Sequence, residues 1–214
     1  MTSDIIKVAQ ESPSITKSSA NDDMADMDIS LEDYPSLQGI SGFLRLIERT
    51  PWFRYLGEPL DEEVVSKARL YTDLLGFPDV WPAEVEDWAE AASVLEANDF
   101  NNPAWEAEEQ LFAGVTATAL EFVEEDLLSM VMSYVQQKAG EIIGDAAWDA
   151  ARRWGIEDEA LINAAAGSAI QCCYQVAMAL AAGEDEAHPL ARKFQIYETG
   201  QWPIAISGNS LNIF

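Results

Sequence analysis

The sequence is poor in the residues that most metal centres, redox sites and nucleic-acid surfaces require. It contains one histidine and two cysteines among 214 residues, and 12 lysines and arginines against 38 aspartates and glutamates. A single histidine excludes most sites built from several histidines, and two cysteines exclude a disulfide scaffold. The formal net charge of −26 excludes a basic surface that would bind nucleic acid or an anionic membrane directly. We expect no cofactor.

The chain nevertheless has the composition of a folded protein. Hydrophobic residues make up 49% of it, well above the content of disordered chains. Residues 1–30 are rich in serine and aspartate and predict a disordered acidic tail, so we assign the folded domain to 31–214. The tail has no basic start followed by a long apolar run, which argues against a secretory signal and favours a cytoplasmic protein.

Apolar residues recur at steps of three and four along most of the domain, which predicts a mainly α, single-domain bundle of five to seven helices. Asp61 is the expected N-cap of one helix, and Gly76 is its expected end. Pro82 and Pro103 are each expected to open a further helix. The segment after Pro103 is long enough that we expect a kink or break at Gly114 or Gly140.

The run from Ala160 to Gly183 contains no charged residue. It is long enough to span a membrane, but too many of its positions are polar, so we expect no membrane span. A helix without charge on any face is typical of the centre of a bundle. Cys172 and Cys173 lie within this run and point to different sides of a helix, which predicts buried free thiols in a reducing compartment.

The C-terminal residues change to a strand pattern. Ile204 and Ile206 alternate with small residues, and a turn containing Gly-Asn follows before a second alternating run. This pattern predicts a short β-hairpin within about 194–214, packed against the helices. Phe194, Ile196 and Tyr197 are candidates for a third strand.

The acidic residues are unevenly distributed. No lysine or arginine stands between Arg69 and Lys138, whereas fifteen aspartates and glutamates do. Such a face would suit a basic protein partner, and the chain would then be a non-enzymatic interaction module, such as an inhibitor, an immunity protein or a mimic of nucleic acid. The alternative is a merely solvated surface of an acidic or salt-adapted proteome. The candidate partner surface consists of Glu84, Glu86, Asp87, Glu90, Glu106, Glu108 and Glu109.

A second class of function is Mg²⁺-dependent phosphohydrolysis. Carboxylates three or four residues apart share a helix face, and two such pairs on facing helices can hold a hard cation. Glu121 lies three residues from Glu124 and four from Glu125, and Glu141 lies four residues from Asp145. All-helical nucleotide pyrophosphatases space both pairs by three, so the second pair departs from that layout. No basic cluster nearby would hold phosphates, and the interaction module is therefore the preferred hypothesis.

Overall fold

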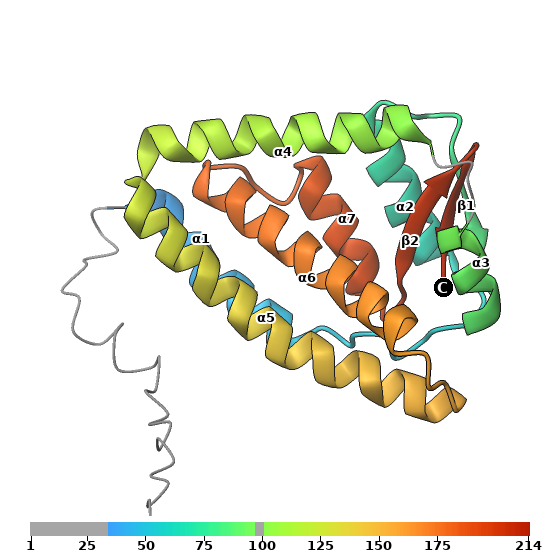
Figure 1. Ribbon diagram of the computed structural model, residues 1–214. Coiled ribbons are helices and arrows are strands. Elements are labelled where there is room, and N and C mark those ends of the chain that lie inside the picture. Colours follow the sequence, from blue (N-terminus) through green and yellow to red (C-terminus); the bar gives the residue numbers. More distant parts are fainter. Residues whose placement is uncertain (1–33, 97–100) are drawn as a thin grey trace, which may run out of the picture.

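The fold is described by a computed structural model that covers residues 34–96 and 101–214. The predicted disordered tail, 1–30, lies outside the described residues. The described part contains seven α-helices and a C-terminal hairpin, which confirms the mainly α prediction (Figure 1). In chain order the elements are η2 (a 3-10 helix, Pro35–Leu37), α1 (Gln38–Arg49), α2 (Glu62–Leu75), β1 (Trp81–Glu84), α3 (Trp88–Glu96), α4 (Asn102–Phe122), α5 (Glu125–Trp154), α6 (Glu159–Ala181), α7 (Pro189–Tyr197), β2 (Pro203–Ser207) and β3 (Ser210–Ile213).

Helix α6 is the centre of the bundle, as its uncharged sequence predicts. It packs against α1, α4, α5 and α7, and most of its residues are buried (Figure 1). Within the described residues it is the one helix long and apolar enough to cross a membrane, yet 56% of its most apolar stretch is buried inside the protein. Its polar Ser168 accepts a hydrogen bond from the indole of Trp202 at 2.9 Å. Cys172 and Cys173 are free and buried, which confirms that prediction.

Two helix ends were readable from local sequence. The Asp61 carboxylate accepts a hydrogen bond from the backbone N–H of Val64 at 2.9 Å and caps α2. Gly76 ends the same helix in the left-handed conformation, with φ of 97°, which favours glycine over residues with a Cβ.

The hairpin belongs to a three-stranded sheet of order β1-β3-β2, in which β2 is antiparallel and β1 parallel to β3. The parallel partner begins at Trp81, so the prediction that Pro82 opens a helix is wrong, and α3 begins only at Trp88. A parallel pairing joins residues that are far apart in the chain and leaves little local signal. Helix α2 packs against this sheet, and together they enclose a second small core.

The prediction of a third strand at 194–197 is also wrong, because these residues form the end of helix α7. Pro189 occupies the first turn of that helix, and the ring nitrogen Nδ1 of His188 accepts a hydrogen bond from the Leu190 N–H at 3.2 Å. The helix-starting proline overrides the alternation of apolar residues that follows it. The hairpin strands therefore span only Pro203–Ser207 and Ser210–Ile213.

The long helical segment breaks at neither predicted glycine. Gly114 lies inside α4 and Gly140 inside α5, whereas the chain turns at Val123, whose backbone is extended and whose side chain is buried. Glu125 and Asp126 occupy the first turn of the following helix, where acidic side chains interact favourably with the helix dipole. The acids from Glu124 to Asp126 therefore indicated the start of α5, and the prediction of a break at Gly114 or Gly140 did not take them into account.

Candidate functional site

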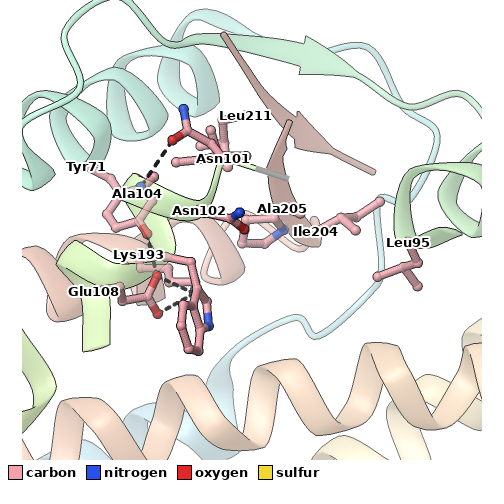
Figure 2. A pocket seen from close by; sticks show the side chains of 13 residues that line it. Tyr71, Leu95, Asn101, Asn102, Ala104, Glu108, Lys193, Ile204, Ala205 and Leu211 are labelled. Carbon is pink, nitrogen blue, oxygen red and sulfur yellow. Dashed lines mark hydrogen bonds and ion pairs between the residues drawn. The ribbon is translucent and has the colours of Figure 1, made fainter. Parts of the chain in front are cut away.

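An apolar pocket lies between the end of α3, the start of α4, strand β2 and helix α7, and Figure 2 shows the side chains that line it. Its volume is about 450 Å³. We call it the α4–β2 pocket. Its size falls within the range of roughly 300–1,000 Å³ that ligand pockets occupy. Much of its wall is apolar, with contributions from Leu95, Ala104, Ile204, Ala205, Ile206 and Leu211.

Asn101 holds the beginning of α4 against the hairpin and so shapes one side of the pocket. Its side-chain oxygen accepts a hydrogen bond from the Ala104 N–H at 3.1 Å and caps the helix (Figure 2). Its side-chain amide donates to the carbonyl of Gly208 at 2.9 Å, and its backbone N–H donates to Ile206. Asn101 is therefore the N-cap of α4, and Pro103, which was expected to open a helix, lies in its first turn.

A largely buried ion pair lines the pocket. The Lys193 ammonium of α7 donates to both carboxylate oxygens of Glu108 from α4, at 2.6 and 2.9 Å (Figure 2). The phenol of Tyr71, from α2, donates to the same carboxylate at 2.7 Å. The side chains of Lys193 and Glu108 are only 22% and 14% exposed. Three helices are thereby joined at one carboxylate.

The electrostatics keep this pair charged. Burial disfavours the ionised carboxylate of Glu108, but the charge of Lys193 and the hydrogen bonds to the carboxylate outweigh burial and hold its pKa below the ordinary value. Burial likewise disfavours the charged Lys193, yet the Glu108 carboxylate raises the pKa of this ammonium above its ordinary value. Burial, together with the Glu108 charge, raises the pKa of Tyr71 well above its ordinary value.

These groups are poorly suited to catalysis. A carboxylate that is held ionised by a cation and a phenol is a weak general base, because efficient bases have pKa values near the working pH. Burial, the dominant cause, raises the pKa of the neighbouring Cys172 thiol to about 12, so this cysteine is held as the unreactive thiol. The ion pair therefore fixes the floor of the pocket and leaves the apolar walls to interact with a ligand.

The acidic partner candidates divide into one largely buried residue and six exposed residues. Glu108 forms the ion pair with Lys193, which corrects the prediction that it belongs to an exposed partner surface. The other six are exposed, and we call them the α3–α4 acidic surface: Glu84, Glu86, Asp87, Glu90, Glu106 and Glu109. Helical geometry explains the division within α4, because Glu106 and Glu108 are separated by about 200° around the axis. Glu108 follows Ala104 by four residues on the core-facing side, a spacing that could have identified it.

Three members of the α3–α4 acidic surface also stabilise local structure. The Asp87 carboxylate accepts from the Glu90 N–H at 2.8 Å, and the Glu90 carboxylate accepts from the Glu86 N–H at 2.7 Å, so both act at the start of α3. The Glu84 carboxylate accepts from the Leu60 N–H at 3.1 Å. Within residues 34–96 and 101–214, the side chains of Glu86, Glu106 and Glu109 make no such bond.

The five magnesium candidates are not brought together. Glu121 lies in the last turn of α4 and Glu124 precedes α5, so the expectation that they share one helix face is wrong. Glu141 and Asp145 do share a helix, but Glu141 lies sixteen residues beyond Glu125, or about 24 Å along α5. No group of three or more histidines, cysteines, aspartates or glutamates in the described part of the chain is placed to hold a metal ion.

Sequence reasoning did not find the pocket itself. Lys193 and Glu108 are 85 residues apart in the chain, and no local pattern links them. Trp105 lines the pocket and is 64% exposed, which is unusual for so large an apolar side chain. Its position directly after the Asn-Pro-Ala start of a helix was visible in the sequence, but its exposure was not.

Comparisons with known proteins add no relative from which a role could be transferred. No family model matches the chain, and neither a curated protein nor a solved structure matches it. The features from which a function can be inferred are therefore the pocket, the ion pair of Glu108 and Lys193, and the α3–α4 acidic surface.

Proposed function

We propose that this protein is a non-enzymatic interaction module that binds a basic protein through the α3–α4 acidic surface. The six carboxylates come from the end of β1, the start of α3 and the first turns of α4, which lie at the same end of the molecule (Figure 1). An inhibitor, an immunity protein or a mimic of nucleic acid would each use such a surface. A cytoplasmic location fits the two free thiols.

One observation carries the proposal, namely the contrast between the buried acid and the exposed acids. Glu108, whose side chain is only 14% exposed, has Lys193 as a partner at 2.6 Å. None of the six exposed carboxylates lies within 4.0 Å of a lysine or arginine nitrogen in the described part of the chain. Their charges remain available to a partner, and opposite charges across an interface chiefly accelerate association.

The test replaces exposed glutamates by lysine at the positions where this change affects local structure least. The surface variant carries Glu86→Lys, Glu106→Lys and Glu109→Lys, whose carboxylates accept no hydrogen bond within the described residues. A control variant carries Glu48→Lys, Glu121→Lys and Glu157→Lys, which are also exposed but belong to α1, the end of α4 and the loop after α5. Both variants change the net charge equally, so only the position of the change differs.

Wild-type protein and both variants are used to capture partners from an extract of the source cell at physiological salt, followed by association kinetics with any captured protein. We expect wild type and the control variant to capture the same basic protein. The surface variant should associate at least about tenfold more slowly. Capture of no basic protein by wild type, or equal association by the surface and control variants, contradicts the proposal.

A further inference from the structure

We propose that the α4–β2 pocket receives one large apolar side chain from the basic partner, and that lysines or arginines flanking this side chain contact Glu109. This inference rests on the proposed function and adds to it the kind of segment that the surface recognises. The occupant is a short basic stretch with a single aromatic or branched aliphatic residue, which we call the anchor.

The pocket walls favour an uncharged occupant. Ile204, Ala205 and Ile206 present apolar surface, and the ion pair that lines the pocket, Glu108 with Lys193, is already mutually neutralised. A charged side chain entering the pocket would lose hydration without meeting an unpaired opposite charge. An apolar side chain gains free energy by leaving water, and a volume of about 450 Å³ can hold one.

Trp105 marks the mouth of the pocket as a contact surface. It lines the pocket while remaining 64% exposed, and tryptophan is among the residues that contribute most to binding at protein interfaces. Asn102 also lines the pocket, is exposed, and offers an amide group that can bond to a peptide backbone. A large aromatic surface with an adjacent amide suits a peptide segment.

The negative charge next to the pocket indicates which partner residues should flank the anchor. Glu109 lies four residues after Trp105 and therefore on the same side of α4. Its carboxylate is exposed and lacks an ion pair in the described ranges. An anchor in the pocket would hold its neighbouring residues within reach of this acid, where lysine or arginine is favoured and acidic residues are repelled. A second copy of this chain, with its net charge of −26, is a poor occupant for the same reason.

Three short peptides, acetylated and amidated at their ends, separate the contributions of anchor and charge. The first has phenylalanine flanked by two lysines on each side, the second replaces the phenylalanine by alanine, and the third replaces the lysines by glycine. Binding to the full chain and to its variants is measured by nuclear magnetic resonance, following the backbone N–H signals of the pocket residues Ala104 and Leu211. Where Trp105 is present, its indole N–H signal, assigned with the Trp105→Phe variant, is followed as well. We expect the first peptide to bind roughly tenfold or more tightly than the second.

Two variants examine the pocket directly. Ala205→Phe fills the cavity, and Trp105→Ala removes an exposed side chain and so keeps the test valid if the first variant fails to fold. Each should abolish the advantage of phenylalanine over alanine, while binding of the alanine peptide remains salt-dependent. Thermal unfolding of each variant verifies that the fold is retained.

The outcomes distinguish this inference from the proposed function. Equal binding of the phenylalanine and alanine peptides, with loss of both in the surface variant, contradicts the anchor and leaves the acidic surface intact. Equal binding of the glycine and lysine peptides contradicts the basic flanks, and it contradicts the proposed function too if the surface variant binds normally. No binding by any of the three peptides, or self-association as the only interaction seen at the pocket, contradicts the inference.

Discussion

Glu106 and Glu108 stand two residues apart in α4 and have opposite environments. Glu106 is exposed and has no ion-pair partner in the described residues, whereas Glu108 is 14% exposed and is held by Lys193 and Tyr71. The same residue type therefore stabilises the fold on one side of the helix and leaves a charge available on the other. An acidic composition alone does not distinguish these two roles, but position around the helix does.

The largest effect should come from breaking the buried pair. Lys193→Met leaves the Glu108 carboxylate buried without its cation, and we expect a loss of about 3 kcal/mol in the free energy of unfolding, measured by urea denaturation. Lys67→Met is the matched control, because Lys67 pairs with the exposed Glu63 and its loss should cost under about 1 kcal/mol. Equal losses in the two variants would show that burial does not distinguish the pairs.

The pH dependence of the unfolding free energy also tests the contribution of the ionised Glu108 carboxylate. Because the folded state holds the pKa of Glu108 below its ordinary value of 4.5, the ionised carboxylate stabilises the fold above that value. This contribution declines as the pH falls through 4.5 toward the lower pKa of the folded state. The difference in unfolding free energy between wild type and Glu108→Gln should be constant above about pH 6 and shrink as the pH falls toward 3. A difference that does not change with pH would contradict the ion pair.

A smaller change in stability is expected from the exposed acids at the start of helix α3. Asp87→Ala removes the acceptor for the Glu90 N–H and should cost about 1 kcal/mol in thermal or urea unfolding. Glu86→Ala, at the neighbouring exposed position, should change stability by less than about 0.5 kcal/mol, because its side chain accepts no such bond in the described part of the protein. Equal unfolding stabilities of the Asp87→Ala and Glu86→Ala variants would contradict this prediction.

Magnesium should have the smallest effect. Since Glu121, Glu124, Glu125, Glu141 and Asp145 are not assembled into one site, millimolar MgCl₂ should shift the unfolding midpoint no more than NaCl of equal ionic strength. Calorimetric titration measures the same property directly. Saturable binding that disappears in Glu121→Gln and Glu124→Gln would revive the phosphohydrolase hypothesis.

The sequence predicted those features that depend on neighbouring residues. Asp61 and Gly76 bound a helix through local hydrogen bonds and backbone conformation, and the uncharged composition of 160–183 requires a buried position. The sequence failed where distant segments decide the outcome. Strand β1 exists because it pairs with β3, which is more than a hundred residues away in the chain, and Pro82 gave a competing local signal.

The candidate site was predictable only in part. The exposure of Glu106 and Glu109 follows from their positions around α4, and the same argument could have placed Glu108 on the buried side. The pocket was not predictable, because its floor joins α2, α4 and α7 through Tyr71, Glu108 and Lys193. Such a network becomes visible only once the helices are packed.

The most direct test of the proposed interaction is a map of the carboxylates that touch the partner. A zero-length reagent that links carboxylates to lysine amines is applied to the complex with the captured basic protein, and the linked residues are identified by mass spectrometry. We predict links from partner lysines to Glu84, Glu86, Asp87, Glu90, Glu106 and Glu109, and none to Glu108. Links concentrated instead on Glu48, Glu121, Glu141 or Glu157 would contradict the assignment of the partner to the α3–α4 acidic surface.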